Sequence, residues 1–116
     1  MKNDPQALLK QLSASLKLTY EVQDWGIINA DAQRLCEFIS YYKRNKMERT
    51  QAYQVFELIL ASFNEKLQEE ATSSDELRTF ITQHGKDFPD QIEYWKDLKN
   101  DEEFPIAKDL RLFTQE

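Results

Sequence analysis

The sequence predicts an all-α protein, a compact single-domain bundle of five to six helices over residues 1–116. Apolar residues recur three and four positions apart through most of the chain, a spacing that places them on one face of a helix. Only two glycines and three prolines interrupt this pattern. One short segment, residues 17–22, alternates polar and apolar residues, but a strand there would have no second strand to pair with. We therefore expect a helix end or an extended connector in that segment.

The composition is that of a folded protein. Hydrophobic residues make up 41% and aromatic residues 12% of the chain, enough for a core without disulfides or a structural metal. A typical domain has about 100–150 residues, so 116 residues predict one domain. The apolar content excludes a disordered chain. The two glycines exclude collagen-like sequences and nearly every glycine-rich phosphate loop.

The cysteine content and the apolar runs predict a cytoplasmic protein. Cys36 is the only cysteine, so nothing indicates the disulfides of an oxidising compartment. The first residues lack the apolar run and the cleavage site of a signal peptide. The longest apolar runs, such as residues 58–61, have four residues, whereas a membrane-spanning helix needs about 18 or more. We expect no contact with a membrane.

Two helices are predicted in the first 46 residues. Asp4 and Pro5 have the residue types of an N-cap and a first helical position, and leucines at helical spacing continue to about residue 17. The sequence Asp24-Trp25-Gly26 predicts a turn. Asn29 or Asp31 then caps a second helix that ends at the polar run 43–46. Its apolar face consists of Leu35, Phe38, Ile39 and Tyr42.

The longest helix is predicted from about residue 47 to about residue 70. At 1.5 Å per residue it would be roughly 35 Å long, about the diameter of a small domain. Val55 and Leu58 widen its apolar face, so we expect it to be the central helix, contacted from more than one side. The other members of its apolar stripe are Tyr53, Phe56, Ile59, Leu60, Phe63 and Leu67.

Three shorter helices are predicted after residue 71. Ser73 and Glu76 fit a capping box at the start of the first, and Gly85 suits the left-handed position that ends it. The second runs from Pro89 or Asp90 to about residue 99, with Ile92, Trp95 and Leu98 directed inward. The acidic loop 100–103 separates it from a last helix that begins at Phe104-Pro105.

The sequence offers little support for catalysis, a metal or a cofactor. His84 is the only histidine, and it lies beside a predicted helix end, where it can bind the last carbonyl groups. Cys36 follows Leu35 in an apolar pattern, which favours an inert buried thiol. One histidine and one cysteine cannot supply the three or four ligands of a zinc site. Glu93 and Asp97 lie one helical turn apart, as a pair of catalytic carboxylates would, but such pairs arise readily among 21 acidic residues. We expect no enzymatic activity.

Charge is distributed unevenly along the chain. Residues 1–64 contain eight basic and seven acidic residues, a net charge of +1, and residues 65–116 contain seven basic and fourteen acidic residues, a net charge of −7. These values sum to the formal net charge of −6. An acidic surface attracts a basic partner and speeds association, although acidic residues also simply keep a small protein soluble.

The leading functional prediction is a non-enzymatic module that binds another protein with a basic surface. An immunity protein or antitoxin that neutralises a basic toxin is one concrete form, suggested by size, charge and the lack of catalytic residues. Tyr94 and Trp95 are adjacent, so if Trp95 is buried, Tyr94 is exposed among carboxylates, as in the anchor of an interface. The predicted partner-binding residues are Asp90, Glu93, Tyr94, Asp97, Asp101, Glu102 and Glu103.

Two alternative functions are kept. The first is a self-associating structural homodimer, whose interface would contain Val55 and Leu58. The second is nucleic-acid or regulatory binding through the basic cluster in residues 43–49. Tyr41 and Tyr42 directly precede this cluster, a mixture of aromatic and basic residues found in proteins that stack on bases. The acidic overall balance makes nucleic acid the less favoured partner. The four basic residues of this cluster are Lys43, Arg44, Lys46 and Arg49.

Overall fold

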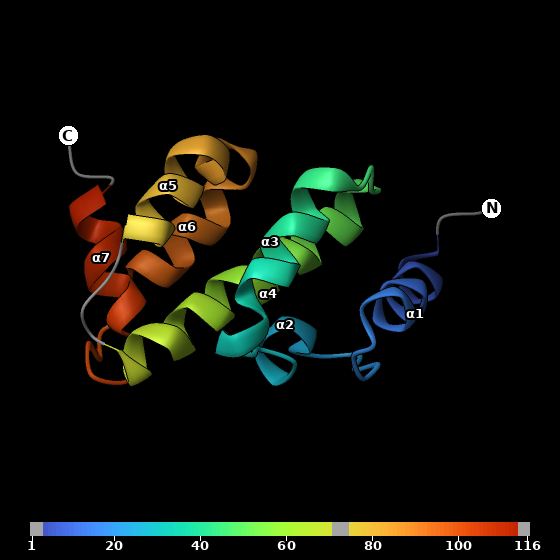
Figure 1. Ribbon diagram of the computed structural model, residues 1–116, viewed down its shortest axis with the longest axis horizontal. Helices are drawn as coiled ribbons and strands as arrows, with labels where there is room; N and C mark the ends of the chain where they lie inside the picture. Colours follow the sequence, from blue (N-terminus) through green and yellow to red (C-terminus); the bar gives the residue numbers. More distant parts are fainter. Residues whose placement is uncertain (1–3, 71–74, 114–116) are drawn as a thin grey trace. The chain divides into compact units, whose positions relative to one another are not determined.

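The computed structural model describes residues 4–70 and 75–113. All the regular secondary structure within these two ranges is helical, which confirms the all-α prediction. The α-helices are α1 (Pro5–Leu16), α2 (Trp25–Ile28), α3 (Leu35–Arg44), α4 (Arg49–Glu69), α5 (Asp75–His84), α6 (Pro89–Lys96) and α7 (Pro105–Phe113), and the short 3₁₀ turns are η1 (Ala32–Arg34) and η2 (Gly85–Asp87) (Figure 1). The described residues thus contain seven α-helices, against the five to six predicted. The additional helix is α2, a single turn that begins within the segment predicted to be a turn.

The chain divides into two compact units, Met1–Ser62 and Phe63–Glu116, and the boundary falls inside α4. The prediction of one domain over residues 1–116 stays a prediction. None of the helices in the described ranges is both long and apolar enough to cross a membrane.

In the first unit, α1 begins as predicted. The Asp4 carboxylate accepts a hydrogen bond from the backbone N–H of Gln6 (3.2 Å), and Pro5 occupies the first helical position. The helix ends at Lys17, which adopts a left-handed conformation (φ 58°). Residues 18–21 then form an irregular connector that leads to the bend at residues 22–24. Of the two conformations predicted for residues 17–22, a helix end or an extended connector, most of the segment adopts the connector.

The turn predicted at Asp24-Trp25-Gly26 is wrong in one respect, because Trp25 and Gly26 are the first residues of α2 and are buried. Asp24 adopts the positive φ of this corner (57°), and Gly26 does not. The Trp25 indole N–H donates to the Ser13 hydroxyl (2.8 Å), which itself donates to the Leu9 carbonyl (2.9 Å). This buried chain of hydrogen bonds joins α2 to α1.

Asp31 is the predicted cap of the second helix, and its carboxylate accepts from the Gln33 backbone N–H (3.0 Å) at the start of η1. Leu35 and Phe38 on α3 are buried as predicted. Cys36, however, is exposed, so the prediction of a buried thiol is wrong. Adjacent helical residues point about 100° apart, and Leu35 takes the inward direction.

Helix α4 is the long helix that the sequence predicts. Every residue from Leu58 to Asn64 is buried, as expected for a helix contacted on all sides. Tyr53 is an exception to the predicted stripe, because 46% of its surface is exposed near the beginning of α4.

In the second unit, Leu77 and Phe80 of α5 are buried as predicted. Ser73 of the predicted capping box lies outside the described residues. Gly85 does not adopt a left-handed conformation, so that prediction is wrong. The chain instead continues directly into η2, where the imidazole of His84 lies 3.5 Å from the Asp87 carboxylate.

Helices α6 and α7 pack against each other in the second unit. Ile92 and Trp95 of α6 are buried as predicted, but the helix ends at Lys96, three residues earlier than expected. The buried Asn64 side chain on α4 positions the start of α7. Its amide oxygen accepts from the Ile106 backbone N–H (3.2 Å), and its amide nitrogen donates to the Glu103 carbonyl (3.1 Å).

Candidate protein-binding surface

Helix α6 places four of the seven predicted partner-binding residues on one face. These residues, Asp90, Glu93, Tyr94 and Asp97, are all exposed, and we call them the acidic stripe. Their spacing of three, one and three positions spans two helical turns on the same side of a helix. The opposite side of α6 is buried through Gln91, Ile92 and Trp95. The burial of Trp95 therefore determines which residues face the solvent.

The chain around α6 explains where this helix begins and ends. Pro89 occupies the first position, where its missing N–H leaves no helical hydrogen bond unmade. Asp90 follows in the first turn, where the positive end of the helix dipole favours a carboxylate. At the other end, the backbone N–H of Asp97 donates to the Glu93 carbonyl (3.1 Å). Asp90 thus also stabilises the helix on which the stripe is built.

Tyr94 is the aromatic residue of the stripe, and 61% of its surface is exposed. Its ring meets the ring of Trp95 edge to face, with centroids 6.4 Å apart. Trp95 is 3% exposed and packs in the same manner against Phe104 (6.2 Å). The buried Trp95 ring thus packs against Tyr94, so Tyr94 presents a large side chain that needs little further ordering on contact with a partner.

The acidic stripe contains three carboxylates and no basic residue. Lys96 lies 3.6 Å from the Glu93 carboxylate, an exposed pair that contributes little energy. Among the described residues, no ion pair within 4.0 Å involves Asp90 or Asp97. These two carboxylates therefore remain available to cations of another molecule.

Arg111 binds both Asp101, the fourth of the predicted acidic residues, and the end of α6. Its guanidinium binds the Asp101 carboxylate (2.8 Å) and also donates to the carbonyl of Lys96 (3.0 Å). Arg111 thus links the turn that contains Asp101 to the end of α6, and it balances the charge of Asp101. The sequence pattern did not indicate this pairing, because Asp101 and Arg111 are ten residues apart and belong to different elements.

The two remaining predicted residues, Glu102 and Glu103, lie in the turn before α7. Both backbone N–H groups donate to the Asn100 side-chain oxygen, at 3.0 and 3.1 Å. The Glu103 carbonyl accepts from Gln68 on α4 (2.6 Å). The turn is held by its backbone, which leaves both carboxylates exposed. They add negative charge to the second unit but are not on the helical face of the stripe.

The described part of the chain contains no group of three or more His, Cys, Asp and Glu side chains that could hold a metal ion. Outside the stripe, partial burial raises the pKa of Asp109, with Lys108 acting in the opposite direction.

The chain matches no protein-family model, and no curated protein or solved structure shows a detectable similarity to it.

Proposed function

We propose that this chain is a non-enzymatic protein-binding module whose acidic stripe captures a partner protein with a basic surface. The proposal rests on one observation: Tyr94 is 61% exposed and lies among the three carboxylates of the acidic stripe. Large aromatic anchors within a polar rim are typical of interface hot spots. The net charge of −7 in residues 65–116 adds a long-range attraction for a basic surface.

A protein that neutralises a basic toxin is one concrete form of this proposal, in keeping with the small size, the acidic charge and the cytoplasmic location predicted from the sequence. This form is proposed by analogy with such proteins in these general properties. The general proposal of a basic protein partner depends only on the stripe.

The test is affinity capture from native lysate with the full-length protein as bait. Bound proteins are released at high salt and identified by mass spectrometry. We expect a stoichiometric basic protein that elutes with salt, because salt screens exposed charges beyond about 10 Å at 0.1 M. The double variant Glu93→Lys with Asp97→Lys should lose this protein while keeping the helical circular dichroism of the parent.

The matched control is Glu69→Lys with Glu70→Lys, which changes the net charge by the same amount at two exposed positions at the end of α4. This variant should capture the partner as the parent does. Equal loss in both variants would mean that only net charge matters, and capture by the stripe variant would refute the proposed surface.

Tyr94→Ala separates the aromatic anchor from the charges. With the captured partner purified, we expect affinity to fall at least about tenfold, since truncating an interface hot spot costs about 2 kcal/mol or more. This loss should persist at high salt, whereas the effect of the charge reversals should shrink.

The homodimer alternative loses its predicted interface, because Val55 and Leu58 have no exposed surface. Self-association through other residues would appear as twice the monomer mass at micromolar concentration in sedimentation velocity, with no partner present. The basic cluster in residues 43–49 remains the alternative for nucleic-acid binding.

A further inference from the structure

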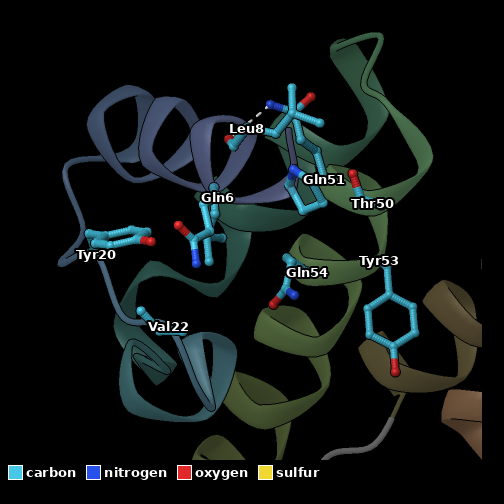
Figure 2. Close-up of a pocket in the computed structure, with 10 residues that line it drawn as sticks. Gln6, Leu8, Tyr20, Val22, Thr50, Gln51, Tyr53 and Gln54 are labelled. Atoms are coloured by element: carbon cyan, nitrogen blue, oxygen red, sulfur yellow. Dashed lines mark hydrogen bonds between the residues drawn. The ribbon is translucent and has the colours of Figure 1, made fainter. Parts of the chain in front are cut away.

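A hollow lies within the first unit between α1, the connector after it and the first turns of α4. Its volume is about 220 Å³, and every side chain that lines it is uncharged. Figure 2 shows Tyr20 of the connector and Val22 of the bend that follows it on one side, with Thr50, Gln51 and Gln54 of α4 across from them. Gln6 and Leu8 of α1 lie along a third side.

The hollow keeps apolar surface exposed. Val22 is 67% exposed and Tyr53, which also lines the hollow, is 46% exposed. The side-chain amides of Gln6 and Gln54 make no hydrogen bond within the described residues. Each amide offers both donors and an acceptor, which is what the backbone of a bound peptide needs.

A second, more open hollow of about 590 Å³ adjoins the first, because Leu8 and Gln51 line both. Gln51 forms the partition, where its amide nitrogen donates to the Leu8 carbonyl (3.2 Å) (Figure 2). The charged residues that line the second hollow are the cations Lys46 and Arg49 and the carboxylate Glu48. An uncharged hollow therefore continues into one with a net positive lining.

The residues before this second hollow are also basic. Lys43, Arg44 and Lys46 are exposed, and none of them has an ion-pair partner in the described parts of the chain. Of these three residues, Lys46 lines the second hollow. The protein as a whole is acidic, so this cluster of cations is a local exception that favours an anionic ligand.

We propose that the two hollows together form a docking site for a short acidic peptide segment of another protein. One large apolar side chain of the segment would enter the uncharged hollow, and the Asp or Glu residues beside it would lie against Lys46 and Arg49. Gln6 and Gln54 would hydrogen-bond its backbone. Charge complementarity selects this occupant, since the net positive lining of the second hollow attracts an acidic ligand and repels a basic one.

This site is independent of the acidic stripe. It belongs to the first unit and has the opposite charge preference, whereas the stripe belongs to the second unit. Reversal of the stripe charges must therefore leave peptide binding unchanged, so the two proposals fail separately.

The test is selection from a random peptide display library on the immobilised full-length protein at low salt. We expect the enriched peptides to combine an aromatic or aliphatic residue with several Asp or Glu residues on one side of it. The most enriched peptide, synthesised with a fluorophore, then serves as the probe for affinity measurements by fluorescence anisotropy.

Two pairs of variants locate the binding site. Val22→Asp should weaken binding of the acidic probe at least about tenfold, because a carboxylate in the hollow repels it. Ile27→Asp is the matched control, since Ile27 is an exposed apolar residue (47%) of the same unit that lines neither hollow. Lys46→Glu should weaken binding similarly, and Lys99→Glu, at an exposed position of the second unit, should not.

Three results would overturn the proposal. They are selection of neutral or basic peptides, failure of any peptide to be enriched, and equal effects of the test and control variants. Binding of a single-stranded oligonucleotide that is lost in Lys46→Glu, without enrichment of acidic peptides, would assign the surface to nucleic acid and reject the peptide site.

Discussion

At the scale of single residues, Gly26 has a packing role that its neighbours in the sequence do not reveal. It lies in α2, where an added Cβ atom would be 2.8 Å from the backbone nitrogen of Leu58 on α4. It would also be 3.0 Å from the Glu57 side chain. A contact this close to backbone cannot be relieved by a change of rotamer, so α2 and α4 can approach only because residue 26 has no side chain.

We predict that Gly26→Ala lowers the free energy of unfolding by about 1–3 kcal/mol, the usual cost of overpacking. This loss would exceed the gain of at most about 1 kcal/mol that alanine brings to a helix. Urea denaturation monitored by circular dichroism measures it. Gly85→Ala is the control, because its Cβ would meet no backbone atom of another element and only the Ile81 side chain, with the Cγ2 methyl at 3.1 Å. Equal stability of the parent and Gly26→Ala would contradict the assigned contact.

Asp109 supplies a prediction for pH. Burial raises its pKa above the ordinary value of 3.8, against the opposing effect of Lys108. The folded protein therefore binds this proton more readily than the unfolded chain, so the carboxylate lowers stability at all pH values above its folded pKa. The penalty diminishes as the pH falls through that pKa and is absent below about pH 3.8.

Asp109→Asn should consequently melt at a higher temperature than the parent at pH 7, and the difference should shrink as the pH approaches 3.8. Thermal melts at several pH values measure both effects. Lys108→Gln is the complementary variant and should lower the melting temperature at pH 7, because it removes the cation that opposes the burial penalty. A melting temperature of Asp109→Asn below that of the parent at every pH would show that burial is not the dominant effect.

At the scale of elements, an arginine side chain in each unit donates a hydrogen bond to a backbone carbonyl at a helix end. Arg34 donates to the Leu16 carbonyl at the end of α1 (2.7 Å) and pairs with Glu37. The hydrogen bond between Arg34 and Glu37 raises the pKa of Arg34 and lowers that of Glu37. Arg111 binds the carbonyl of Lys96 at the end of α6 in the same way. Both arginines satisfy carbonyl groups that a helix end leaves without an internal partner.

The apolar face of α4 yields a prediction about the core. Phe56 is fully buried, with its ring centroid 5.8 Å from that of Tyr42, whereas Tyr53, one turn earlier on the same helix, is 46% exposed. We expect Phe56→Ala to cost about 3–5 kcal/mol of unfolding free energy. Tyr53→Ala should cost much less, although it deletes a side chain of similar size. Chemical denaturation of both variants tests this, and similar losses would contradict the burial assigned to the two positions.

At the scale of the whole molecule, charge and structure divide at nearly the same place. Residues 1–62 have a net charge of +1 and residues 63–116 a net charge of −7, and the boundary between the structural units lies between Ser62 and Phe63. The second unit thus carries the self-repulsion that follows from its excess of acidic residues.

We predict that NaCl stabilises the protein. Raising its concentration from about 0.01 to about 0.3 M should increase the melting temperature by about 2–4 °C, because added ions screen repulsion among exposed carboxylates. The variant Glu102→Gln with Glu103→Gln should melt higher than the parent at low salt and converge with it at high salt. A melting temperature that falls as NaCl rises would indicate that ion pairs, and not repulsion, dominate.

The sequence predicted the helices best where the signal, an apolar periodicity or a helix cap, depends only on residues close together in the chain. Asp4 and Asp31 mark helix starts by accepting hydrogen bonds from backbone N–H groups two positions away, and the periodicity of α4 depends only on its own residues. The interpretation failed at Cys36, Gly26 and Gly85, where the outcome depends on which neighbouring side chain is buried or which helix lies opposite. The position of Tyr94 on the exposed side of α6 was predictable once Trp95 was assigned to the core.

By itself, the sequence determined the helical class, the long helix α4, the charge imbalance and the residues that form the acidic stripe. These properties follow from composition and from the 3.6-residue period, both of which can be read along one segment. Only the tertiary structure decided that Asp101 is paired with Arg111, that Gly26 lies against α4, and that uncharged and basic hollows adjoin between α1 and α4. Each of these joins residues at least ten positions apart, and such contacts arise from packing, which no local pattern specifies.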